Sequence, residues 1–152
     1  MTPPKKKILA IASGGGHWVQ LLRMRPAFEG HDVVFVTVDA AYGEDLDGDR
    51  LLVVNDATRW NKLGLVRLAL RLLMILLRER PAVIISTGAA PGFIALRLGK
   101  LLGARTIWLD SVANVERLSM SGENISRHAD LCLTQWAHLE RGDCPAYRGA
   151  VL

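Results

Sequence analysis

The sequence is poor in the residues that build metal or redox centres. Its two cysteines, Cys132 and Cys144, form no C-x-x-C pair and no metal-like spacing. Its four histidines do not cluster with cysteine in the way a zinc site requires. We therefore expect no metal and no disulfide framework, and a reduced, cytosolic setting is the simplest expectation.

Long apolar runs are also missing. Lys5, Lys6 and Lys7 are followed by only five apolar residues, 8–12, which is too short for the core of a signal peptide. The most apolar later segment, 61–80, is interrupted by arginines, and its longest uninterrupted run is Leu72 to Leu77. Six residues cannot span a bilayer, so the sequence predicts no transmembrane helix.

Several function classes lack their motifs. There is no G-x-S-x-G of a serine hydrolase and no Gly-Lys-Ser/Thr of a P-loop. Aromatic residues make up only 6% of the chain and no basic stripe is interleaved with them, which argues against nucleic-acid binding. The D-x-D patterns at Asp45–Asp47 and Asp47–Asp49 are weak metal signals in an acidic loop that is expected to be solvated.

What the chain does have is a regular alternation of short apolar runs and helical patterns over 152 residues, half of them apolar. Strands are predicted at 8–12, 32–38, 51–54, 82–86, 106–109 and 131–134. Helices are predicted at 17–27, 61–80, 93–102 and 121–129, with loops at 40–50 and 87–92 and no clear pattern after Trp136. The fold expected for residues 1–152 is a single Rossmann-like α/β domain, a parallel sheet of about six strands with helices on both faces.

Ligands in such sheets bind beyond the carboxyl ends of the strands, here 13–17, 87–92 and 110–114. The first of these is Ser13-Gly14-Gly15-Gly16-His17. Glycines between a strand and a helix let the backbone approach a phosphate, which the free N–H groups of the helix can bind. A tight turn without a ligand is the plainer alternative. The net charge of +4 also favours an anionic partner.

A dinucleotide is a second alternative for this loop. Gly14 and Gly16 fit the G-x-G-x-x-G fingerprint and Asp39 follows the second strand as a ribose-binding acid would, but Val19 occupies the third glycine position. His17 is a candidate phosphate ligand or general base, or simply a polar turn residue. Asp110, after the fifth strand, is a candidate base or sugar ligand, or a helix cap.

The long helix at 61–80 carries surplus apolar surface. Arg67, Arg71 and Arg78 project within about 40° of one another at 100° per residue, while leucines cover most of the remainder. The helix is expected to lie in a membrane interface, with help from Lys5 to Lys7, or to contact a protein partner. A helix buried within the fold is the third alternative.

Taken in order, these segments resemble the PssD family of bacterial exopolysaccharide proteins, whose eukaryotic relative is asparagine-linked glycosylation protein fourteen. The matching stretches are 13–17 with 20–22, 86–88 with 91–92, 109–111, 118–122, 129–130, 134–136 and 149–152. The resemblance covers essentially the whole chain. It extends more distantly to the N-terminal domain of MurG.

The resemblance implies the acceptor half of a two-domain GT-B glycosyltransferase that is expected to be inactive without its partner. A separate small protein would bind the UDP-sugar, N-acetylglucosamine or a similar sugar, and the acceptor would be a polyprenyl-diphosphate-linked sugar. The setting implied is the cytoplasmic face of a membrane, the inner membrane in bacteria, and the reaction is an inverting transfer without a cofactor.

By the same resemblance, Asp110 occupies the position of the family's usual glutamate. The acceptor is expected to meet the residues Ser13, Gly14, Gly15, Gly16, Thr87, Gly88 and Ser111. Val151 and Leu152 are expected to dock the partner, and His17 is the first candidate base. Two rival functions stay open, a self-contained NAD-type enzyme and a non-catalytic membrane adaptor.

Overall fold

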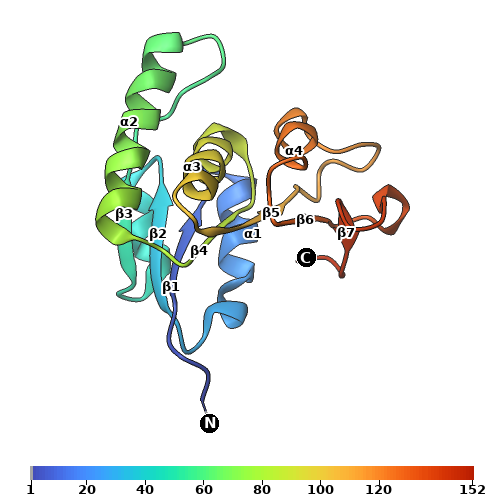
Figure 1. Ribbon diagram of the computed structural model, residues 1–152, viewed down its shortest axis with the longest axis horizontal. Helices are drawn as coiled ribbons and strands as arrows, with labels where there is room; N and C mark the ends of the chain where they lie inside the picture. The colour runs from blue at the N-terminus through green and yellow to red at the C-terminus, as the bar shows by residue number, and fades with distance from the viewer. Residues whose placement is uncertain (1) are drawn as a thin grey trace.

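The computed structural model describes residues 2–152 and has a seven-stranded parallel sheet in the order β3-β2-β1-β4-β5-β6-β7 (Figure 1). The strands are β1 (Lys7–Ile11), β2 (Asp32–Thr37), β3 (Arg50–Val53), β4 (Val83–Ser86), β5 (Arg105–Leu109), β6 (Leu131–Thr134) and β7 (Ala146–Tyr147). The helices are α1 (Gly16–Arg23), α2 (Lys62–Glu79), α3 (Ala89–Leu101) and α4 (Met120–Ile125). Three short 3-10 helices, η1 (Arg25–Phe28), η2 (Ala40–Leu46) and η3 (Ala137–Leu139), complete the fold.

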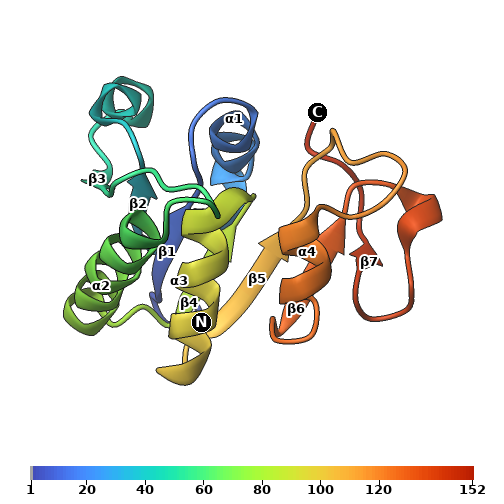
Figure 2. The same ribbon diagram turned by 90° about the horizontal axis from the view of Figure 1, so that it is seen from above.

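Helices cover both faces of the sheet, which confirms the α/β prediction (Figure 2). Because side chains alternate along a strand, each strand contributes to two cores. Leu9 and Ile11 of β1 pack with α2 and α3 on one face. Ala10 of the same strand packs on the other face, with Trp18 of α1. The central strands β1, β2 and β4 therefore have continuous apolar runs, as a doubly covered parallel sheet requires.

The predicted boundaries differ from the structure mainly where proline stands. The first helix ends at Arg23 instead of residue 27, because Pro26 starts a separate 3-10 helix. α3 begins at Ala89, four residues earlier than predicted, and takes Pro91 into its first turn. A proline is tolerated there because the first N–H groups of a helix lack intrahelical partners.

Three other expectations changed. The 40–50 segment, predicted as a loop, folds mostly into η2, which begins with the Asp39 carboxylate accepting a hydrogen bond from the Ala41 N–H. The helix predicted at 121–129 is shorter, Met120–Ile125. β7 is an added strand of two residues beside β6, too short to produce a recognisable pattern in the sequence.

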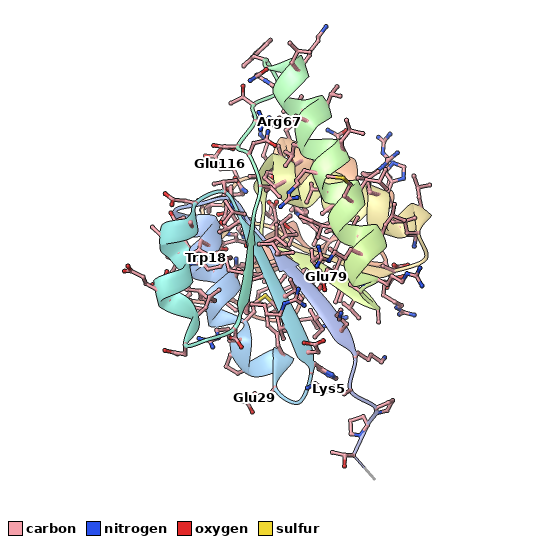
Figure 3. All side chains as sticks on the ribbon, turned by 90° about the vertical axis from the view of Figure 1, so that its left-hand side faces the viewer. Lys5, Trp18, Glu29, Arg67, Glu79 and Glu116 are labelled. Carbon is pink, nitrogen blue, oxygen red and sulfur yellow. The ribbon has the colours of Figure 1, made fainter. Side chains whose placement is uncertain are left out.

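At the amino edge of the sheet, the buried carboxylate of Glu79 pairs with two partly exposed cations and joins α2 to two strands. The Glu79 carboxylate accepts hydrogen bonds from Arg50 at 2.8 and 3.1 Å and from Lys7 at 3.2 Å. Glu79 is labelled in Figure 3, where it lies beside β1, and Arg67 projects from the same helix closer to its start. The hydrogen bonds from Arg50, with the further contribution of Lys7, hold the pKa of Glu79 below its usual range.

We expect Glu79→Gln to lower the free energy of unfolding by about 2 kcal/mol at neutral pH, because charge-assisted hydrogen bonds are lost. A lowered pKa means that the folded state binds fewer protons, so this stability is present above the unfolded-state pKa and is lost as the pH falls below about 5. Urea unfolding at pH 7 and at pH 4 measures both effects. Glu29→Gln, at an exposed site, is the control. An equal loss at both pH values would contradict the assignment.

Candidate functional site

The strand order reverses between β1 and β4. From β1 the chain proceeds outward through β2 to β3, and from β4 it proceeds outward the other way to β5, β6 and β7. α1 leaves β1 on one face, and α3 leaves β4 on the other (Figure 2). Ligands of open α/β sheets bind at this kind of switch point. The glycine loop and the 87–88 segment are therefore neighbours at the carboxyl edge.

Tyr42 of η2 packs against the glycine loop. The Gly15 N–H donates to the Tyr42 hydroxyl at 2.8 Å, and a Cβ on Gly14 would lie 2.7 Å from the same oxygen. Gly15 has a φ of +66°, a conformation that side chains disfavour. Within residues 2–152, the first N–H groups of α1, from Gly16 to Trp18, have no hydrogen-bond acceptor. An anion could accept these bonds and gain from the helix dipole.

Two hydrogen bonds between His17 and Thr87 join the segments that follow β1 and β4. The Thr87 hydroxyl donates to the His17 carbonyl at 2.6 Å, and His17 Nδ1 lies 3.0 Å from the Thr87 carbonyl oxygen. A carbonyl oxygen can only accept, so Nδ1 carries the hydrogen, and Nε2 of the neutral ring keeps its lone pair. The half-buried ring is thereby fixed in one orientation and one tautomer.

Gly88 makes room for that ring. A Cβ on Gly88 would lie 2.4 Å from His17 Nδ1, and the φ of Gly88 is +143°. The next residue, Ala89, has a φ of +66°, which is unusual for alanine. The Gly88 N–H is held by the Ser86 hydroxyl at 3.1 Å. The strained turn at the start of α3 is thus shaped around the imidazole of His17.

Asp110 is 2% exposed and organises the loop after β5. Its Oδ1 accepts hydrogen bonds from Trp108 Nε1 at 3.0 Å and from the Ser119 hydroxyl at 2.6 Å. Its Oδ2 accepts from Asn114 Nδ2 at 3.0 Å and from the Ser119 N–H at 2.9 Å. Both carboxylate oxygens are engaged, and a Cβ on Gly122 would lie 2.6 Å from Oδ1. The carboxylate therefore faces inward and ties 114–122 to the sheet.

A buried amide network connects this loop to α1 and to the end of the chain. Gln20 on α1 donates to the Ser111 hydroxyl at 3.2 Å and accepts a bond from Gln135. Gln135 also donates to the Asp110 carbonyl at 3.0 Å, and its Oε1 accepts from the Val151 N–H at 2.9 Å. Arg23 donates to the Val151 carbonyl at 3.2 Å. The 151 segment is thereby held beside α1, while the Leu152 side chain is 83% exposed.

The site residues predicted from the sequence thus gather at one edge but differ in exposure. Gly15 and Gly16 are exposed, and Ser13, Gly14 and His17 are half-buried. The buried members of the set position neighbouring residues by hydrogen bonds or close packing; they are Thr87, Gly88, Asp110 and Ser111. No local pattern pointed to Tyr42, Gln20, Gln135 or Ser119, because a single buried or half-buried polar side chain has no periodic signal.

The acidic loop and the cysteines are used structurally. Asp45 accepts a hydrogen bond from Trp18 Nε1 at 3.0 Å, and Asp49 pairs with Arg25 at 2.7 Å. Across residues 2–152, no group of three metal-binding side chains occurs. Cys132 and Cys144 are free thiols, and burial raises the pKa of the Cys132 thiol.

α2 presents two adjacent exposed stripes. One is apolar and contains Leu63, Val66, Leu70, Met74 and Leu77, each more than half exposed. The other contains Arg67, Arg71 and Arg78, which are exposed and have no carboxylate partner within the described chain. The opposite face of the helix packs into the core through Leu68, Leu72, Ile75 and Leu76. Among the helices of residues 2–152, none has the length and hydrophobicity of a membrane span.

Asp110→Asn should lower the free energy of unfolding by about 3 kcal/mol, because the new amide N–H₂ group would face donors that now bind the carboxylate. Denaturant unfolding of the purified chain measures this. Asp143→Asn, at an exposed position, should change the stability little. A loss no greater than that of the control would show that the four hydrogen bonds contribute nothing.

Several solved structures are similar in fold to this chain. Acinetobacter baumannii MurG matches with a TM-score of 0.75 at 12% identity, over 95% of this chain and 45% of MurG. UDP-N-acetylglucosamine 2-epimerase of Rickettsia bellii matches with a TM-score of 0.72 at 12% identity, over 97% and 46%. A glycosyltransferase of Rickettsia africae matches with a TM-score of 0.67 at 11% identity, over 95% and 43%.

The chain therefore spans less than half the length of these structures and has the fold of one half of a GT-B architecture. No curated protein matches it in sequence. A family model described as "Oligosaccharide biosynthesis protein Alg14 like" matches residues 53–151, well over half of the chain. That stretch contains the Thr87–Gly88 turn, Asp110 and the amide network around Gln135. The chain belongs to the Alg14-like family of oligosaccharide biosynthesis proteins.

Proposed function

We propose that this chain is the acceptor-binding subunit of a two-component glycosyltransferase. It would bind a polyprenyl-diphosphate-linked sugar and act with a separate donor-binding protein that holds a UDP-sugar, N-acetylglucosamine or a similar sugar. Family membership supports a role in oligosaccharide biosynthesis. The match to one half of MurG supports an enzyme whose acceptor-binding and donor-binding halves are separate proteins. The observation that carries the proposal is the open glycine loop beside the oriented His17.

The glycine loop suits a diphosphate. Gly14, Gly15 and Gly16 present backbone without side chains, and the free N–H groups of the first turn of α1 face the same edge. Backbone donors and a helix dipole can offset phosphate charge without a metal. Ser13 adds a hydroxyl beside the loop. Thr87, Gly88 and Ser111 would support the acceptor site from below, since they are buried beneath His17 and Gln20.

His17 is the proposed general base. Its Nδ1–H is held by the Thr87 carbonyl, so Nε2 is free to take the proton from an acceptor hydroxyl. The oxygen would attack the anomeric carbon of the UDP-sugar as the bond from that carbon to the UDP oxygen breaks. UDP leaves with the bonding electrons, and the configuration at carbon inverts. Asp110 is proposed as a positioning residue, because its oxygens already accept four hydrogen bonds.

The donor-binding partner is proposed to dock near Val151 and Leu152. Gln135 and Arg23 fix the backbone of Val151 beside α1, while the Leu152 side chain stays exposed. A partner held there would approach the carboxyl edge of the sheet, where the glycine loop lies. The amide network through Gln135 and Gln20 would also link the docking site to the acceptor site.

We expect His17→Ala to reduce kcat of the reconstituted complex by about a hundredfold or more, the usual scale for loss of a general base. The assay measures transfer from UDP-N-acetylglucosamine to a polyprenyl-diphosphate-linked sugar, with the chain alone and with its partner. His128→Ala, at an exposed histidine, is the matched control. Near-normal turnover by His17→Ala would remove the base assignment.

The same assay separates the rival functions. Transfer by the chain alone would contradict the two-component proposal. Binding of NAD by the isolated chain would favour a self-contained dinucleotide enzyme. An adaptor that only recruits its partner would tolerate loss of His17 but not disruption of α2.

α2 is the proposed attachment to the cytoplasmic face of the membrane. Its apolar stripe would enter the interface, and Arg67, Arg71 and Arg78 would lie at the level of the headgroups. Arginines near an anionic surface contribute about 1 kcal/mol each. Lys5 and Lys6 precede β1, and Lys7, its first residue, pairs with Glu79 at the end of α2. The three lysines are assigned no direct part in the membrane contact.

Replacing Arg67, Arg71 and Arg78 together with glutamine should weaken binding to phosphatidylglycerol vesicles by about tenfold or more at low salt. Vesicle sedimentation of the purified chain measures the partition. The matched control replaces the exposed Arg105, Arg117 and Arg127, which gives the same change in net charge. Equal binding by both triple variants would exclude membrane attachment through α2, and loss of partner capture instead would identify α2 as a protein interface.

A further inference from the structure

An apolar groove of about 440 Å³ lies between three helices. α2 contributes one wall, the first turns of α3 contribute the second, and α4 closes the third side. Its apolar lining consists of Leu65, Val66, Ala69, Phe93, Ile94 and Met120. The polar atoms at its edge are few. The amide of Asn124 is already used, because it donates to the carbonyl of Met120 at 2.9 Å.

The groove adjoins two surfaces already described. Val66 lines the groove and also belongs to the apolar stripe of α2, where it is 57% exposed. Ala90 also lines the groove and lies in the first turn of α3, two residues after Gly88. Gly88 packs directly against the ring of His17. The groove thus adjoins the apolar stripe of α2 through Val66 and, through Ala90, the turn that packs against His17.

A positive charge lies at the mouth of the groove. Arg59 lines it, with its guanidinium 4.6 Å from the centre of the Trp60 ring and 3.4 Å from Met120 Sδ. In the portion of the chain that the structure describes, this guanidinium pairs with no carboxylate. It can therefore pair with an anion that enters from the carboxyl edge of the sheet.

We propose that this groove binds the isoprenoid units next to the diphosphate of the acceptor, with Arg59 beside the phosphate; this inference rests on the proposed function. The occupant has an anionic head and a methyl-branched apolar chain, which matches a charged mouth and a lining of aliphatic and aromatic side chains. A peptide would leave its backbone hydrogen bonds unpaired against this lining. The acceptor lipid would be bound by its chain as well as by its head.

If the groove binds isoprenoid, the complex should prefer lipid-linked sugars even in solution, where no membrane is present. We compare two acceptors that carry the same sugar diphosphate, one with a farnesyl group and one with a methyl group. The farnesyl compound is used in solution, without vesicles or detergent, so attachment of α2 to a membrane does not contribute. The complex should show a KM for the farnesyl acceptor at least about tenfold lower, since burial of only two methylene groups changes affinity by that factor.

Ala69→Trp fills the groove and should abolish this tenfold preference while leaving the KM for the methyl acceptor within about twofold. Ala27→Trp, at an exposed position in η1 on the opposite face, is the matched control and should keep the preference. Met120→Asp is a second test at a side chain that is 59% exposed, so the fold should tolerate it. A preserved preference in correctly folded Ala69→Trp and Met120→Asp would overturn the inference.

Binding to the isolated chain gives an independent arm. Titration calorimetry with farnesyl diphosphate and with pyrophosphate should show tighter binding of farnesyl diphosphate, and Ala69→Trp should remove the difference. Equal affinities for the two ligands would refute the proposal that the groove binds isoprenoid, even if transfer occurs. Absence of transfer to either acceptor, with tight binding of farnesyl diphosphate retained, would refute the proposed function and leave the groove standing as a site for isoprenoid diphosphates.

Discussion

The reciprocal hydrogen bonds between His17 and Thr87 join the ends of β1 and β4, where the strand order reverses. The geometry around the imidazole depends on this pairing. It fixes the tautomer of the imidazole, sets the start of α1 beside the start of α3, and requires glycine at position 88. The positive φ of Ala89 is backbone strain that arises because two helices begin so close to one histidine.

A second constraint is the burial of polar side chains behind that edge. Asp110, Gln20 and Gln135 lie in the interior and are hydrogen-bonded. Gln20 and Gln135 bind partners from distant parts of the chain, whereas the Asp110 carboxylate binds partners within residues 108–119. Such networks specify one arrangement, because any shift would leave a buried donor or acceptor unpaired. They make the loops after β5 and β6 an extension of the rigid sheet. The exposed glycine loop can thus present its N–H groups from a fixed base.

α2 links stability to surface chemistry. Its last turn is tied to the amino edge through Glu79, and its inner face fills the core. Its outer face is left with apolar side chains and unpaired arginines, and its first turns form one wall of the groove toward α3 and α4. One helix therefore carries three surfaces, and the packing of its inner face decides which side chains remain available to a membrane or a lipid.

Local patterns were enough to predict the α/β class, the positions of six strands along the chain and the position of the glycine loop, because buried strands and glycine turns leave such patterns. It also placed the three arginines on one side of α2, since helical periodicity alone fixes that angle. The contacts between side chains far apart in the sequence follow from the tertiary structure, because no local pattern encodes them. Only long-range packing set Tyr42 against Gly15 and left the His17 imidazole oriented by a carbonyl seventy residues away. The Asp110 carboxylate is held by partners close in sequence, but their irregular backbone leaves no periodic pattern.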